Sequence, residues 1–180
     1  GLHASADIAG KVVLEWKANP EKDINCYVIE SRAVDRTRWR DVAQVENCQS
    51  EETGLKPGEE RFYRIKAVDV ETLESAWSEE TRGSARPLPA PPTSLTAEWN
   101  GDGVKFAWKP PEGDIKEYRV YRKGLLSSSK ISSSTNPSCV MDSKVVGSGI
   151  KVCVTAVDAS GLESLQSETL VIKPPTDSGG

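Results

Sequence analysis

The segment that decides the fold is KVVLEW at residues 11–16, which the chain repeats as GVKFAW at residues 103–108. Apolar residues take every second position in both segments, and each series ends on a tryptophan, Trp16 or Trp108. A strand with one apolar face and one mixed face is typical of a half-buried strand in an antiparallel sheet. The alternation therefore predicts two equivalent strands, each with its tryptophan in a core.

The repeat extends outward from these segments over most of the chain. Residues 2–4, 23–27, 67–69 and 73–75 recur in the same order at 95–97, 114–118, 156–158 and 162–164. The spacing falls only from 93 residues (2 to 95) to 89 (73 to 162). Five matched blocks in one order predict two copies of a single module.

A proline-rich segment, RPLPAPP at residues 86–92, lies between the copies and is expected to be extended and semi-rigid. We therefore expect two domains: residues 1–86, with a truncated first strand, and residues 87–180, with this linker and a C-terminal linker tail. No helical period is sustained, so each copy is predicted to be a sandwich of a three-stranded and a four-stranded sheet. Three tyrosines are predicted to face the cores beside the tryptophans: Tyr27, Tyr63 and Tyr118.

The combined pattern resembles fibronectin type III modules. It consists of a lone tryptophan on the second strand, an Ile-x-x-Tyr-x-Ile strand, a Gly-Leu-x-Pro corner and a Tyr-x-Ile-x-Ala-Val strand. The matching residues are Trp16, Ile24, Tyr27, Ile29, 54–57, Tyr63, Ile65 and Ala67 in the first copy, and Trp108, Ile115, Tyr118, Val120 and Ala156 in the second. The resemblance implies an all-β protein with two consecutive seven-stranded immunoglobulin-like sandwiches.

The second copy departs from the family pattern in two places. Val152 stands where the family has its corner tyrosine, and the Leu-x-Pro element is absent. Residues 127–134 are rich in serine where an edge strand belongs, so a loose loop or a short strand is expected there. The Leu-Glu-Ser-x-x-Ser segments at 73–78 and 162–167 are similar to those of secreted bacterial modules.

The composition argues against several functional classes. A net charge of −4 gives no general attraction to nucleic acid or to anionic lipid. No apolar run approaches the roughly 20 residues that a membrane span requires, so no membrane insertion is expected. His3 is the one histidine. A catalytic serine or cysteine would therefore lack a nearby histidine base, and a zinc ion would lack the cluster of histidine and cysteine ligands that it usually has. We therefore expect no enzyme activity and no cofactor.

Each copy contains two cysteines, Cys26 and Cys48 in the first and Cys139 and Cys153 in the second. We predict one disulfide in each copy, Cys26–Cys48 and Cys139–Cys153, and hence an extracellular, periplasmic or cell-surface location. The alternative is four reduced thiols in a cytosolic protein.

One group of residues could form an interaction face on the first copy. Trp39 lies among alternating arginines, and Trp77, expected in the last strand, lies beside a strand with basic residues on its outer face. This face is either a ligand platform or an intramolecular cation–π stack that covers the sheet. The candidate residues are Arg36, Arg38, Trp39, Arg40, Arg64, Lys66 and Trp77.

These expectations favour a non-catalytic, monomeric tandem module cut from a longer protein. It would act as a spacer, adhesion or protein-interaction segment with a protein or glycan partner. The alternatives are accessory modules of a secreted carbohydrate-active enzyme, or a recognition module that uses the face around Trp39, Arg38 and Arg40.

Overall fold

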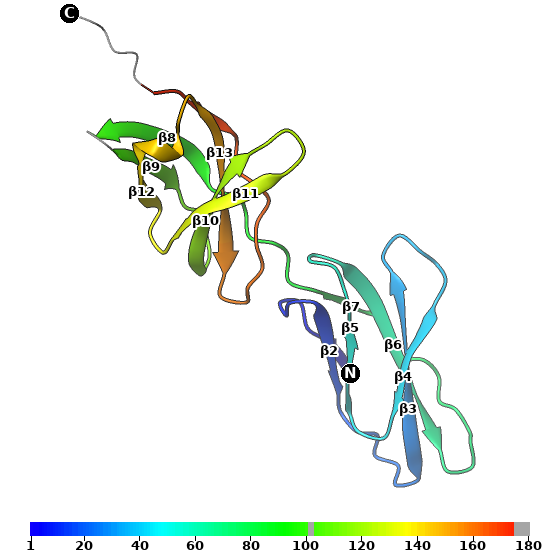
Figure 1. The fold of residues 1–180 in the computed structure, drawn as a ribbon. Coiled ribbons are helices and arrows are strands. Elements are labelled where there is room, and N and C mark those ends of the chain that lie inside the picture. The colour runs from blue at the N-terminus through cyan, green and yellow to red at the C-terminus, as the bar shows by residue number, and fades with distance from the viewer. Residues whose placement is uncertain (101–102, 175–180) are drawn as a thin grey trace, which may run out of the picture. The chain divides into compact units, whose positions relative to one another are not determined.

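The computed structural model describes residues 1–100 and 103–174. The chain divides into two compact units, the first spanning Gly1–Pro87 and the second starting at Leu88. Within the described residues the regular structure is β-strand, apart from one 3₁₀ turn, as Figure 1 shows. The predicted class, all-β with two consecutive sandwiches, is confirmed.

The first unit consists of a three-stranded and a four-stranded antiparallel sheet. The three-stranded sheet has the order β1 (Leu2–Ala4), β2 (Lys11–Trp16), β5 (Gln49–Thr53). The four-stranded sheet has the order β4 (Arg40–Val45), β3 (Ile24–Ala33), β6 (Glu60–Asp69), β7 (Thr81–Ser84). The first strand, β1, is only three residues long.

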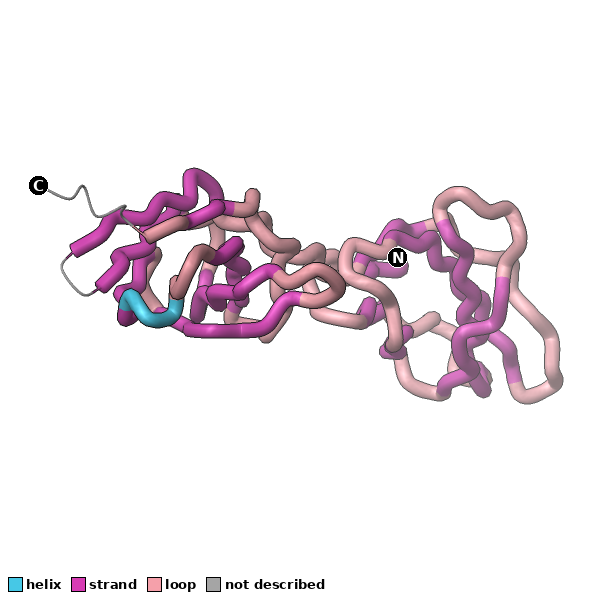
Figure 2. The backbone as a smooth tube through the Cα atoms, turned by 45° about the horizontal axis from the view of Figure 1, so that its top comes forward, coloured by secondary structure: helices cyan, strands magenta, loops and turns pink. Residues whose placement is uncertain are grey.

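The second unit repeats this arrangement. Its three-stranded sheet has the order β12 (Ser138–Asp142), β9 (Gly103–Lys109), β8 (Thr93–Asn100). Its four-stranded sheet has the order β11 (Ser128–Ser134), β10 (Ile115–Lys123), β13 (Ile150–Asp158), β14 (Leu170–Ile172). The 3₁₀ turn η1 (Ser143–Val145), cyan in Figure 2, lies between β12 and β13.

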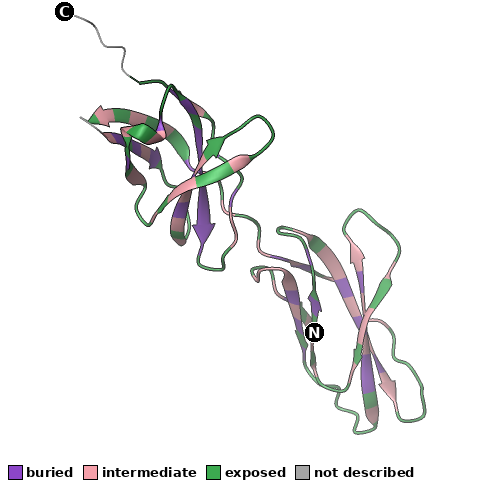
Figure 3. Ribbon diagram, viewed as in Figure 1, coloured by how far each residue is buried: buried purple, intermediate pink, exposed green. Residues whose placement is uncertain are grey.

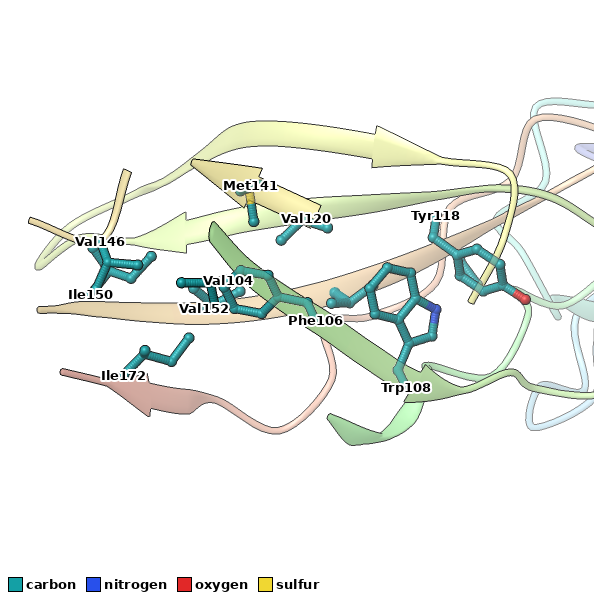
Figure 4. Close-up of a cluster of buried hydrophobic side chains, with 12 residues drawn as sticks. Val104, Phe106, Trp108, Tyr118, Val120, Met141, Val146, Ile150, Val152 and Ile172 are labelled. Carbon is teal, nitrogen blue, oxygen red and sulfur yellow. The ribbon is translucent and has the colours of Figure 1, made fainter. Parts of the chain in front are cut away.

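Each unit has its own hydrophobic core between the two sheets, and the strands alternate between buried and accessible positions (Figure 3). Trp16 packs edge-on against Tyr27, with ring centroids 5.3 Å apart. Trp108 packs in the same way against Tyr118, at 5.4 Å, and Figure 4 shows this pair at one end of the second core. All four side chains are buried, as is Tyr63. The same aromatic contact therefore anchors both sandwiches.

The Leu-Glu-Ser-x-x-Ser segments also have a structural role. In the second unit the hydroxyls of Ser164 and Ser167 accept hydrogen bonds of 2.9 Å from the backbone N–H groups of Ala156 and Val154 on β13. In the first unit Ser75 and Ser78 accept from Ala67 and Ile65 on β6 in the same way. The serines thus satisfy strand donors along a stretch where the segment itself is not a regular strand.

The second unit differs from the first at the serine-rich segment and at the missing Leu-x-Pro element, both of which the sequence marks. The serine-rich segment forms β11, a seven-residue strand rather than a loose loop, because its backbone pairs with β10. Where the first unit has its Gly-Leu-x-Pro corner, the second has η1 and a glycine-containing turn. Val146 is nevertheless buried in this turn, as Leu55 is in the corner of the first unit. Both connections therefore place one apolar side chain in the core.

Candidate functional site

A stack of aromatic rings and cations covers the outer face of the four-stranded sheet of the first unit. The Arg64 guanidinium carbon lies 4.2 Å from the ring centroid of Trp39 and 4.3 Å from that of Trp77. Lys66 Nζ lies 4.8 Å from the Trp77 ring. Arg64 and Lys66 alternate on β6, so both project from the face opposite the core. Two of the predicted basic residues therefore contact the two predicted tryptophans.

Arg32 extends this stack along the sheet. Its guanidinium carbon lies 5.1 Å from the Trp39 ring and 4.4 Å from the Phe62 ring. The sequence interpretation missed Arg32 and Phe62, which are paired across β3 and β6. Arg32 lies two positions after Glu30, so the period-two rule applied to β3 would have placed it on this face.

Carboxylates neutralise the cations of the stack. Glu30 accepts hydrogen bonds from Arg64 at 2.6 and 2.8 Å, and Glu74 accepts from Lys66 at 2.6 Å. Arg32 donates to Glu80 at 2.6 Å. Trp77 lies in the segment before β7 rather than in a strand, contrary to the expectation. The paired charges and stacked rings make this part of the face an internal packing layer.

Of the three alternating arginines, Arg40 turns away from the stack. It donates to the carboxylate of Glu52, whose Oε1 also lies 3.3 Å from Arg61 Nε. Glu52 is buried between the sheets, only 6% exposed. Arg40 and Arg61 therefore compensate a buried negative charge at this end of the first core.

Arg36 and Arg38 remain exposed on the loop between β3 and β4. Arg36 makes a loose, solvent-exposed contact of 3.7 Å with Asp35, and Arg38 has no ion pair with any described residue. Both line a hollow of about 830 Å³ beside Trp39. Five arginines line it against two carboxylates: Arg32, Arg36, Arg38, Arg40 and Arg61, with Glu30 and Asp41.

This hollow can bind a planar anion. A guanidinium presents its donors in a fork that matches a carboxylate, and an exposed arginine has donors to spare. Trp39 forms a wall that its two stacked arginines, Arg32 and Arg64, hold in place. The hollow therefore combines an aromatic ring that is held in place with two exposed guanidinium groups that can donate hydrogen bonds to a ligand.

The disulfide prediction is wrong, because all four cysteines, which lie in the described part of the chain, are free thiols. Cys26 on β3 and Cys153 on β13 are buried outside the two cores. Cys48 and Cys139 instead pack against those cores. A sheet therefore separates the two thiols of each unit. The error came from counting residues along the chain, which does not show which side of a sheet the partner faces.

The corresponding outer face of the second unit has a different chemistry. Glu163 Oε1 accepts hydrogen bonds of 2.6 Å from the hydroxyls of Tyr121 and Thr155, and Oε2 accepts one of 2.7 Å from Arg119. Burial raises the pKa of Glu163, but these hydrogen bonds and the Arg119 charge outweigh it, so the pKa lies below its usual value. A carboxylate network thus replaces the cation–π stack.

The described residues contain no group of three or more histidine, cysteine or carboxylate side chains placed to hold a metal ion. The helices of the described part include none with the length and apolar character that a membrane span requires.

No family model matches the sequence, but comparison with curated proteins and with solved structures finds similar chains. The receptor-type tyrosine-protein phosphatase F of Danio rerio is 28% identical over an alignment of 126 residues. This alignment covers 67% of this chain but only 7% of that protein. The FN1–FN3 domains of chicken CNTN1 are 12% identical, with a TM-score of 0.46 over 96% of this chain and 62% of theirs.

The segment of two fibronectin type III domains from chicken tenascin is 16% identical, with a TM-score of 0.44 over 96% of this chain and 97% of that one. The structural neighbours are thus tandem fibronectin type III domains, the family that the sequence resembles. The chain is similar to a tandem of fibronectin type III domains along nearly its whole length.

Proposed function

We propose that this chain is a non-catalytic protein-interaction segment of a larger extracellular or cell-surface protein. The hollow beside Trp39 is its contact site for an acidic partner segment. The observation that carries the proposal is the pair of exposed arginines, Arg36 and Arg38, that line this hollow. Similarity to tandem fibronectin type III domains, and to a stretch of a protein named as a receptor, supports an interaction role.

A protein partner fits the hollow better than a glycan does. A sugar ring binds an aromatic residue by stacking on its face, but guanidinium groups already lie over both Trp39 and Trp77. Carboxylates, in contrast, suit the excess of arginine over acidic residues that lines the hollow. A segment containing aspartate or glutamate would satisfy Arg36 and Arg38 without disturbing the stack.

The test is selection of ligands from a displayed library of random 12-residue peptides on the immobilised chain. We expect the selected peptides to be enriched in aspartate and glutamate. The variant R36S/R38S should bind them at least about tenfold more weakly, because each lost charge-assisted contact costs on the order of 1.5 kcal/mol or more.

The matched control is K17S/K22S, which removes two exposed cations from the loop at the opposite end of β3, between β2 and β3. It should bind the selected peptides as the wild type does. Peptides without acidic residues, or peptides that bind R36S/R38S as tightly as the wild type, would refute the assignment of the hollow as the contact site.

A further inference from the structure

A basic hollow lies at one end of the second unit, remote in the chain from the Trp39 site. Its volume is about 760 Å³, and the residues that line it include five cations and, among those described, no carboxylate. All five cations are exposed. In a chain with a net charge of −4, such a one-signed cluster is a distinct feature of the surface. The cations are Arg122, Lys123, Lys144, Lys151 and Lys173.

The fold brings these cations together at the ends of three strands and one turn. β10 ends at Lys123, and η1 contains Lys144. Lys151 on β13 pairs with Val171 on β14, two residues before Lys173. Arg122 donates to the carbonyl of Val145, which joins β10 to η1.

Within the described part of the chain, the charges of this end are largely uncompensated. Lys123 donates to the neutral hydroxyl of Thr169 at 3.3 Å. Lys144, Lys151 and Lys173 have no side-chain ion pair with any residue that the structure describes. The cluster is therefore free to attract an anion.

Two leucines project into solvent at the edge of the same hollow. Leu125 and Leu126 form the tip of the hairpin between β10 and β11, and both are fully exposed. The N–H of Gly124 donates to the carbonyl of Ser127 at 2.8 Å, which closes the tip around them. Val171, also exposed, lines the hollow with Leu125. Neither leucine belongs to the core of this unit, so its packing gives no reason for two adjacent apolar side chains here.

We propose that this end of the second unit docks on the surface of an anionic lipid bilayer. The five cations contact the headgroups, and Leu125 and Leu126 enter the boundary of the acyl chains. In an anionic bilayer the negatively charged headgroups lie a few ångströms above the apolar acyl chains. The cations of this surface match the headgroups, and its leucine tip matches the acyl chains. A soluble acidic protein would satisfy the lysines but leave the leucine tip in water. The overall charge concealed this surface from sequence reasoning, because none of the described carboxylates lines the hollow.

The experiment is co-sedimentation of the full chain with large vesicles of phosphatidylcholine, either alone or with about 30% phosphatidylserine. We expect binding to the anionic vesicles only, and loss of that binding in about 1 M salt, where the screening length falls to about 3 Å. The variant K144S/K151S should bind roughly 25-fold more weakly, at about fivefold for each charge removed. The variant L125S/L126S should lose on the order of tenfold.

Two control variants separate docking from general effects. L165S removes an exposed leucine from another loop of the same unit, and K109S/K116S removes two exposed cations at the opposite ends of β9 and β10 from the hollow. Both should bind the anionic vesicles as the wild type does. Sedimentation velocity without lipid tests whether the leucine tip instead pairs two copies of the chain.

Several outcomes would overturn the proposal. Equal binding to neutral and anionic vesicles, or binding to neither, would exclude anionic docking. Wild-type affinity of L125S/L126S would reduce the surface to a site for soluble polyanions. A dimer that dissociates on L125S/L126S substitution, without lipid binding, would assign the tip to self-association. None of these results depends on the Trp39 hollow.

Discussion

The two Leu-Glu-Ser-x-x-Ser segments make the same hydrogen bonds at different depths, which allows one substitution to be compared in two environments. Ser167 and its donor, the N–H of Val154, are both buried in the second unit. The equivalent bond from Ile65 N–H to Ser78 Oγ, 3.1 Å long, is only partly buried in the first. Replacing Ser167 with alanine leaves the Val154 N–H without this partner in a place that water reaches poorly.

The expected cost follows from this difference in burial. A buried donor left unsatisfied costs about 1–3 kcal/mol, so we expect Ser167→Ala to destabilise the second unit by about 2 kcal/mol. For a domain of this size that corresponds to a fall in melting temperature of roughly 10 °C. Ser78→Ala should cost less than about 1 kcal/mol, because water can replace the hydroxyl at a partly exposed bond.

Hydrogen exchange followed by mass spectrometry can measure both variants on the full chain. Peptides from 150–158 should exchange about 30-fold faster in Ser167→Ala under conditions where exchange reports the opening free energy. Peptides from 62–69 in Ser78→Ala should change by less than about fivefold. Ser148→Ala, at an exposed serine, serves as the control and should leave both regions unchanged. Equal effects of Ser167→Ala and Ser78→Ala would refute the argument from burial.

The remaining predictions concern the cores, the thiols and one carboxylate. Trp16→Ala and Trp108→Ala should each destabilise their own unit by about 3–5 kcal/mol in urea denaturation, and a loss below about 1 kcal/mol in either would contradict the packing. Intact-mass analysis should find four thiols in the unreduced protein, and Cys153, fully buried with a pKa raised by burial, should react with iodoacetamide only after unfolding. Because the folded pKa of Glu163 is lowered, its ionised form stabilises the second unit above the unfolded pKa, and this contribution is lost as pH falls through the folded pKa. The stability difference between wild type and Glu163→Gln should therefore be constant near neutral pH and shrink below about pH 4.5, whereas a difference that persists at pH 2–3 would contradict the sign.

The fold could be predicted from the sequence because its signals are local and repeated. Period-two alternation in 11–16 and 103–108 marks which side of a strand faces inward, and Trp16 and Trp108 are indeed buried. The repeat then required two copies of one arrangement, each with sheets of three and four strands. Composition was less informative at β11, where polar side chains concealed a strand that backbone pairing with β10 forms.

The candidate site was only partly accessible to the same reasoning. Alternation placed Arg64 and Lys66 on an outer face, and the sequence also predicted Trp77 beside their strand, where the structure has both cations against its ring. Nothing in the local sequence indicates that Arg40 turns inward to Glu52, because that choice depends on a buried carboxylate from the opposite sheet. The disulfide prediction was wrong for a related reason. It depends on the side of a sheet on which each thiol lies, and the distance between two cysteines along the chain does not show this.

The two copies differ most on their outer faces, which is where we propose that the contacts with partners lie. Both units keep the same aromatic contact and the same serine hydrogen bonds, because both pack a three-stranded sheet against a four-stranded sheet. Their outer faces share almost no chemistry: the first has a cation–π stack beside an arginine-lined hollow, and the second a carboxylate network centred on Glu163. A spacer requires only the shared features, so the vesicle and peptide experiments, and not the divergence itself, distinguish a spacer from two binding modules. The different outer faces match the two different contacts that we propose, an acidic protein segment at the Trp39 hollow and an anionic bilayer at the Leu125 tip.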